Sequence, residues 1–129
     1  MQLHSRRQKD ATFIDSTPIH TTAATSATFD LGQVNGGLIE NILVEVVSSA
    51  SVATTGKICT YTLQDSADGT TFAAVDPAVT TTITAASSAL AAKTVEFPLP
   101  PNTRRYIRVA QTGDTLGSVD GTFTVSLLF

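Results

Sequence analysis

The segment that most constrains the fold is 57–75, which reads KICTYTLQDSADGTTFAAV. Its first part, 57–63, places larger side chains at every second position, as a half-buried β-strand does. Residues 65–69 then interrupt the run with two aspartates, a serine and a glycine, which are typical of a tight turn. The return segment, 70–75, has β composition and one large apolar side chain, Phe72. The whole segment therefore predicts a β-hairpin.

The same two-residue period recurs along the rest of the chain. The eight predicted strands are 26–31, 42–48, 57–63, 70–75, 79–84, 94–97, 103–111 and 121–129. Many short strands separated by turns, without helices between them, are typical of a sandwich or barrel. Only 85–92 could form a helix, and its serines and missing capping box favour a loop or a single turn. We expect an all-β, eight-stranded jelly-roll β-sandwich; an immunoglobulin-like sandwich is the alternative.

Composition supports one folded core. The chain has 129 residues, of which 42% are hydrophobic and only 15% charged, and threonine, serine, alanine and valine dominate. Such a chain is long enough to bury one core, and its residues favour strands over helices. Both faces of 42–48 are largely apolar, which predicts a central strand. The predicted core residues are Phe29, Ile42, Val44, Val46, Leu63, Phe72, Ile107, Val109, Phe123, Val125 and Leu127.

The first 25 residues look different from the rest. Segment 1–25 has no helical period and few apolar side chains, so ordering it alone would cost conformational entropy without compensation. We therefore expect an extended N-terminal arm at 1–25 and the β-sandwich domain at 26–129. The arm is either a frayed tail or a segment that orders on an acidic partner. Its candidate contact residues are Arg6, Arg7, Lys9, Phe13 and Ile14.

Charge and hydropathy exclude several classes of partner. The net charge of −3 argues against nucleic acid as the main partner. No apolar run is long enough to span a membrane, and the N-terminus lacks the apolar core of a signal peptide. We therefore expect no membrane partner and a protein that stays in the host cytoplasm until it joins a larger assembly. The single cysteine, Cys59, lies on the apolar face of its strand and is expected to be buried.

Catalytic and metal-binding patterns are not evident. Both histidines, His4 and His20, lie in the predicted arm, so the sandwich has no histidine to act as a base. No nucleophile elbow, phosphate-binding glycine loop or metal-ligand spacing appears. Asp65 and Asp68 could suggest calcium, but two carboxylates are too few ligands, and a turn already explains both. We expect no enzyme activity, no cofactor and no metal.

Three arginines form a compact group late in the chain. On a strand, Arg104 and Arg108 would share a face with Tyr106 between them, and such a face can bind carboxylates or a polar partner surface. The alternative is a solvated strand face that pairs with Glu45 or Glu96. The residues therefore suggest a partner site or a surface ion-pair network.

The last predicted strand, 121–129, leaves one apolar residue on the wrong side of a simple alternation. Leu128 would face outward while its neighbours in sequence face the core. An exposed leucine on a strand suggests contact with another chain. We expect a homodimer or a capsid contact at Leu128.

Three segments in order along the chain also carry a family likeness: 23–32 (AATSATFDLG), 63–72 (LQDSADGTTF) and 100–109 (PPNTRRYIRV). Together they resemble the cement, or decoration, proteins of short-tailed bacteriophage capsids, of the small jelly-roll type. The resemblance covers most of the chain from about Thr22 onward. The basic segment 1–10 departs from the acidic or apolar start expected of that family.

The resemblance implies a structural protein that binds the outer surface of the assembled shell and bridges neighbouring major capsid proteins, often as a dimer. Its location would be the outer capsid surface of the virion. The alternative is a carbohydrate-binding β-sandwich module of a phage tail or spike protein. Sugar-binding platforms usually rely on exposed aromatic rings, and this chain has no tryptophan and only two tyrosines. The cement-protein interpretation is therefore favoured.

Overall fold

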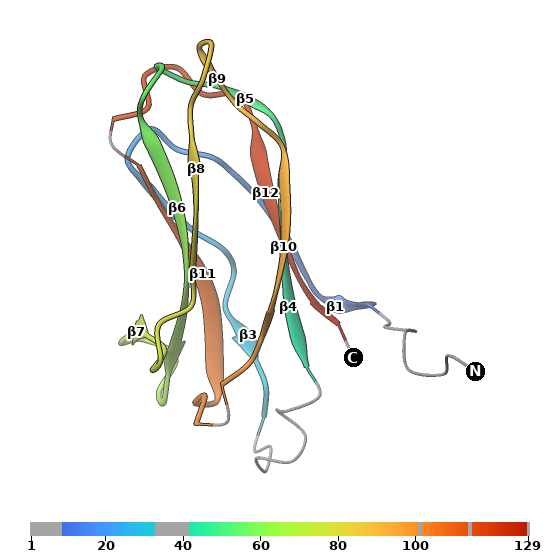
Figure 1. Cartoon of the computed structure of the whole chain (residues 1–129). Coiled ribbons are helices and arrows are strands. Elements are labelled where there is room, and N and C mark those ends of the chain that lie inside the picture. The colour runs from blue at the N-terminus through green and yellow to red at the C-terminus, as the bar shows by residue number, and fades with distance from the viewer. Residues whose placement is uncertain (1–8, 33–41, 101, 114, 129) are drawn as a thin grey trace, which may run out of the picture.

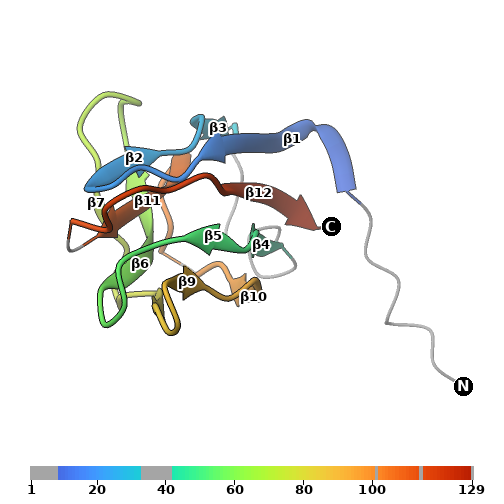
Figure 2. The ribbon, with the colours of Figure 1, turned by 90° about the horizontal axis from the view of Figure 1, so that it is seen from above.

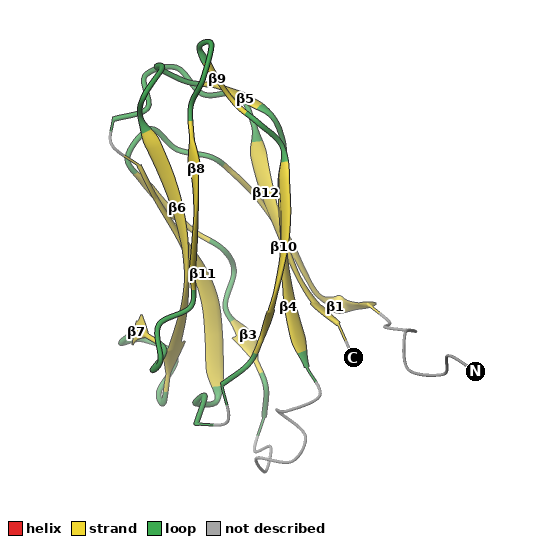
Figure 3. Cartoon of the chain, in the orientation of Figure 1, coloured by secondary structure: helices red, strands yellow, loops and turns green. Residues whose placement is uncertain are grey.

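The computed structural model describes residues 9–32, 42–100, 102–113 and 115–128. Within those ranges every regular element is a strand, so the predicted all-β class is confirmed (Figure 3). Two sheets face each other across the core, and the strands of both sheets run nearly along the long axis of the molecule (Figure 1). No helix long and apolar enough to cross a membrane is present in the described part of the chain.

The first sheet has four strands, which follow one another across the sheet as β1 (Lys9–Pro18), β12 (Thr122–Leu128), β4 (Leu43–Ser48) and β10 (Lys93–Pro98). The second sheet is built on β11 (Tyr106–Gly113) and β6 (Ile58–Ser66). The remaining strands of the second sheet are β2 (Ala23–Thr25), β3 (Phe29–Asp30), β7 (Ala73–Ala74) and β8 (Thr80–Thr84). A small third sheet pairs β5 (Ser51–Val52) with β9 (Ala89–Leu90) at one end of the sandwich.

The order of pairing defines a jelly roll. Antiparallel pairs join β1 with β12, the interrupted strand β2–β3 with β11, β4 with β10, and β6 with β8. The first strand therefore pairs with the last strand, and the second strand pairs with the second-last. The same nesting continues inward to the β6–β8 pair in the middle of the chain. The pairs β12–β4 and β11–β6 then complete two four-stranded layers. This is the predicted eight-stranded jelly-roll sandwich.

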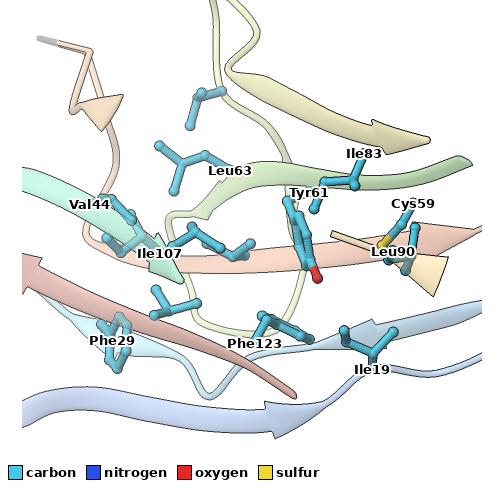
Figure 4. Close-up of a cluster of buried hydrophobic side chains, with 14 of the residues drawn as sticks. Ile19, Phe29, Val44, Cys59, Tyr61, Leu63, Ile83, Leu90, Ile107 and Phe123 are labelled. Carbon is cyan, nitrogen blue, oxygen red and sulfur yellow. The ribbon is translucent and has the colours of Figure 1, made fainter. Parts of the chain in front are cut away.

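The core lies between the two sheets. Alternate residues of β4, β6, β11 and β12 point inward, and ten of the eleven predicted core residues are buried. Figure 4 shows Tyr61 and Phe123 side by side in this core, with ring centroids 5.1 Å apart. The Tyr61 hydroxyl lies 2.7 Å from Ser48 Oγ, so its polar group is satisfied within the core. Cys59 is fully buried, as expected, and burial raises the pKa of its thiol.

The predicted arm is the main departure from the sequence analysis. Of 1–25, the described part from Lys9 belongs to the sandwich, because β1 pairs along β12 and β2 pairs with β11. Figure 2 shows β1 beside β12, at one edge of its sheet. Ile19 is buried, and the side-chain amide of Gln111 accepts from His20 N at 3.0 Å and donates to His20 O at 3.1 Å. The prediction that this part stands outside the domain is therefore corrected.

Polar residues on the inner face of β1 explain why its pattern was missed. Phe13 packs against the core, whereas the next inward positions are Asp15 and Thr17. Their polarity is satisfied locally: Thr17 Oγ1 donates to Asp15 Oδ2 at 2.7 Å, and the Ala27 amide donates to the same oxygen at 2.9 Å. A strand whose inward positions are half polar has no clear hydrophobic alternation.

The predicted hairpin return strand is also different. In 70–75 only β7 pairs with β6, and Phe72 lies outside the core, on the outer face of the second sheet. The prediction that Phe72 is a core residue is wrong. The count of eight strands holds because β1 replaces the return segment as one of the eight. The long partner of β6 at that edge is β8.

Segment 85–92 forms a tight turn instead of a helix. Ala86 and Ala89 exchange two backbone hydrogen bonds across Ser87 and Ser88, whose φ angles are 52° and 60°. Two consecutive residues with positive φ make the two-residue turn that suits a twisted hairpin. This turn lies between β8 and β10, which are edge strands of opposite sheets. The Lys93 Nζ of β10 donates to the Thr82 carbonyl of β8 at 3.1 Å and links those edges.

Candidate partner-binding surface

Two of the residues predicted to bind a partner, Tyr106 and Arg108, lie together on the outer face of the second sheet. There β11 lies between β2–β3 and β6, so its outward side chains stand in the middle of the sheet. Ile107 and Val109 point into the core, while Tyr106 and Arg108 alternate with them on the outer face. Gln64 of β6 is directly opposite Arg108 in the register. Central pairing on both sides gives these side chains a rigid base.

Arg108 is held by two neighbours. Its guanidinium carbon lies 4.1 Å from the centre of the Phe72 ring, and its Nε donates to Gln64 Oε1 at 2.8 Å. A guanidinium above an aromatic face is attracted by the ring quadrupole. Phe72 is half-buried beneath it, so the apolar ring and the arginine stem cover each other. The residue predicted as a core anchor thus supports the surface arginine.

A tight loop places Phe72 there. Asp68 Oδ1 accepts from the amides of Thr70 at 2.9 Å and Thr71 at 3.0 Å, and from Ser66 Oγ at 2.8 Å. The two amides are the main cause that holds the pKa of the Asp68 carboxyl well below its usual range. Gly69, at φ 79°, lies against the Tyr106 ring, where an added Cβ would be 3.5 Å from the ring atoms. The loop therefore folds back onto the outer face of β11.

Arg104 does not share this face. It precedes β11, and its Nη2 and Nε donate to Asp65 Oδ1 at 2.7 Å and 3.1 Å while its backbone amide donates to Asp65 Oδ2 at 2.9 Å. Asp65 is buried, and hydrogen bonds to it raise the pKa of the Arg104 guanidinium. The prediction that Arg104 and Arg108 lie on one face is corrected, because the buried carboxylate draws Arg104 to the end of the sandwich.

Arg105 is also paired. Its Nε and Nη2 donate to the two carboxylate oxygens of Asp30 at 2.7 Å and 2.9 Å, a bidentate pair at the surface. This bond, followed by the Gly32 amide, lowers the pKa of the Asp30 carboxyl from 3.8 to about 2. The expected ion-pair partners, Glu45 and Glu96, are on the other sheet. Two of the three arginines are therefore paired with Asp65 and Asp30.

The other candidate contact residues are scattered. Arg6 and Arg7 lie outside the described residues, and Lys9 begins β1 opposite Leu128. Phe13 packs edge-on against Phe29, with ring centroids 6.2 Å apart.

Ile14 is 42% exposed on the outer face of the first sheet. Leu128 is buried, contrary to the expected outward exposure. Its strand is central, between β1 and β4, and Leu128 is paired in the register with Lys9 and Leu43. The structure thus brings Tyr106 and Arg108 together and leaves the arm residues and Leu128 elsewhere.

Sequence reasoning missed Gln64 and the surface role of Phe72. The alternation in 57–63, continued by one residue, does place Gln64 on the outward face. Its meeting with Arg108 depends on the register between β6 and β11, which the local pattern does not contain.

Farther along β6, β8 and β11 the outward side chains of this face are uncharged. A groove farther along it is lined by Ile58, Thr60, Thr82, Thr112 and Gly113. Among the described residues, no three histidine, cysteine, aspartate or glutamate side chains gather to hold a metal ion. The chemical character of the face is thus an arginine and two aromatic rings beside a strip of threonines.

Among protein families, the family model named Bbp16 matches residues 13–127. Comparison with curated proteins gives no significant match.

Solved structures give distant similarities. A protein of Bacillus endospore appendages, described as disulfide-linked pili, shares 20% identity and has a TM-score of 0.43; the match covers all of this chain and 94% of that one. A chain of infectious bursal disease virus strain Gx shares 14% identity at a TM-score of 0.43, and the match covers 96% of this chain but 31% of that chain. The TmCBM61 module, solved with β-1,4-galactotriose, shares 11% identity at a TM-score of 0.34, with 96% and 86% covered. Similarities this distant do not indicate a function.

Proposed function

This chain belongs to the Bbp16 family, and we propose that it is a structural virion protein that cements a bacteriophage capsid. In this proposal it binds the outer surface of the assembled shell and bridges neighbouring major capsid proteins. The three segments that resemble cement proteins of short-tailed phages support the assignment, and they fall within the strands and loops of one jelly roll. The protein would wait in the host cytoplasm and act on the outer capsid surface.

The observation that carries this proposal is the preformed outer face of the second sheet. Arg108, Phe72 and Tyr106 stand there on central strands or on a loop ordered by Asp68. Arginine and aromatic side chains are enriched at protein–protein interfaces, where they contribute most of the binding energy. A surface held rigid before binding loses little conformational freedom when it docks. Such a face suits repeated contacts with a shell, where avidity multiplies modest affinities.

The proposed role is structural and not enzymatic. The backbone amide and carbonyl of His20 are hydrogen-bonded to the side-chain amide of Gln111. Self-association remains part of the proposal, since many bridging proteins act as dimers. It no longer rests on Leu128, which is buried within one chain.

Carbohydrate binding is less well supported. Tyr61 is fully buried, and Gly69 and Arg105 lie against the ring of the half-buried Tyr106. The Arg108 guanidinium lies over Phe72. A sugar ring needs an open aromatic face on which to stack, and these contacts cover at least one face of each surface ring.

The decisive experiment is co-sedimentation of the purified protein with empty shells of its own phage, alongside a glycan array. We expect saturable binding to shells, a raised disruption temperature of the decorated particle, and no glycan signal. Shells that fail to bind the protein at low and physiological salt would overturn the proposal. Selective glycan binding would favour the tail or spike alternative.

A further inference from the structure

We propose that Arg108 is the residue of the arginine cluster that binds a carboxylate of the partner protein, whereas Arg104 and Arg105 stabilise the fold. The inference rests on the proposed function and specifies its chemistry. The partner would present an aspartate or glutamate side chain to the outer face of the second sheet.

The three arginines differ in the groups that already bind them. Arg104 makes three hydrogen bonds to the carboxylate of buried Asp65, counting its backbone amide. Arg105 holds both oxygens of Asp30 in a bidentate pair. A partner carboxylate would have to displace an existing carboxylate to reach either one. The gain at those arginines would therefore be small.

The Arg108 side chain makes fewer hydrogen bonds than those of Arg104 and Arg105. Only its Nε has an acceptor, the amide oxygen of Gln64, and the described residues provide none for Nη1 and Nη2. No described carboxylate lies within 4.0 Å of the Arg108 guanidinium, and the two ion pairs of the cluster are those of Arg104 and Arg105. The Phe72 ring covers one side of the guanidinium and restricts its orientation. A planar donor group is thus fixed in place with two of its nitrogens available.

A carboxylate fits the two free nitrogens of Arg108, Nη1 and Nη2. The guanidinium fork matches the two oxygens of a carboxylate, and charge-assisted bonds of this kind are about twice as strong as neutral ones. Phe72 also shields the pair from water on one side, which strengthens the attraction. A nucleic acid fits less well, because only one of the three arginines is free of a carboxylate, while Asp65 and Asp30 neutralise the other two.

The test compares two pairs of variants in the full-length protein: Arg108→Gln and Arg108→Lys, with Arg105→Gln and Arg105→Lys as matched controls. Each is titrated onto empty shells at low and at physiological salt. Arg108→Gln should weaken binding about 10- to 100-fold and reduce its salt dependence, since one charge-assisted contact is lost. Arg108→Lys should recover part of the loss, because lysine keeps the charge without the fork. The Arg105 variants should bind shells within about twofold of the wild type.

A parallel titration with a single-stranded dT20 oligonucleotide distinguishes the source of the anion. We expect no binding of dT20 that depends on Arg108. Loss of dT20 binding in Arg108→Gln without loss of shell binding would overturn the carboxylate assignment.

The thermal midpoint separates binding from folding. Arg108→Gln should unfold within a few degrees of the wild type, because the arginine lies on the outer face. If Arg108→Gln binds shells as tightly as the wild type, the inference is wrong while the cement function stands. If the wild type itself does not bind shells, the proposed function and this inference fail together.

Discussion

Phe13 and Phe72 show how two similar residues can take opposite places in one sandwich. Phe13 lies in the segment expected to stand outside the domain, yet it packs against the core beside Phe29. Phe72 lies in the segment expected to anchor the core, yet it supports Arg108 on the surface. Hydrophobicity is the same in both cases. The difference comes from the strand that pairs with each segment: β1 runs along β12, while the 66–72 loop leaves its sheet and folds over β11.

Deletion of residues 1–20 should have the largest effect, and it tests whether the segment that contains Phe13 is part of the sandwich. A detached arm could be removed at little cost, whereas removal of β1 exposes the edge of β12, uncovers the core and leaves Gln111 without the His20 backbone. We expect the truncated protein to be insoluble or to lack a cooperative thermal transition by calorimetry. A truncated protein with an unchanged midpoint would contradict the position of β1 in the first sheet.

A second test contrasts Phe123→Ala with Phe72→Ala. Phe123 is fully buried against Tyr61, so its truncation should lower the free energy of unfolding by about 3–5 kcal/mol. Phe72→Ala should cost only about 1 kcal/mol, from a lost cation–π contact and partial burial. Urea denaturation at one pH measures both values. Equal losses would mean that Phe72 belongs to the core after all.

A third test concerns the side-chain amide of Gln111, which links β11 to His20 just after β1. Gln111→Ala leaves the His20 N–H and C=O without their side-chain partners, and we expect a loss of about 1–3 kcal/mol. Gln64→Ala is the matched control on the outer face, and it should change the unfolding free energy by less than about 0.5 kcal/mol. Hydrogen exchange at the His20 amide should accelerate in the first variant only.

The smallest effect on stability is expected when the pH is lowered through the titration of Asp30. The pKa of Asp30 is depressed from 3.8 to about 2, so its contribution to stability is present above pH 3.8 and is lost as the pH falls toward 2. Asp30→Asn removes this titration, so the midpoint of the variant should fall less than that of the wild type over that interval. The difference should be small, because solvent screens an exposed pair. Parallel slopes in both proteins would show that the Asp30–Arg105 pair does not contribute.

The alternation of strands could be predicted because most inner positions of β4, β11 and β12 are apolar, with Ser48 and Gln111 as polar exceptions near strand ends. Val44, Val109 and Phe123 are each buried as expected. The same rule failed at β1, where Asp15 and Thr17 take inward positions and are satisfied by local hydrogen bonds. Alternation indicates a face only when most positions on that face are apolar.

The surface could be predicted only in part. Tyr106 and Arg108 follow from the period of their own strand, so their common face was predictable. The partners of Arg104 and Arg105 are Asp65 and Asp30, which lie 39 and 75 residues away along the chain. Long-range pairing of this kind depends on the register of whole sheets.

The link between Lys93 and the Thr82 carbonyl has a consequence for how the protein behaves at high concentration. Edge strands present free backbone groups that can template the addition of strands from other molecules, which leads to fibrils and insoluble aggregates. On β8 the Lys93 ammonium occupies one such carbonyl and places a positive charge at the edge. If a second copy approached with its own β8 edge, the Lys93 ammonium groups of the two copies would come together and repel each other. One lysine thus helps keep a threonine-rich, otherwise uncharged strand soluble.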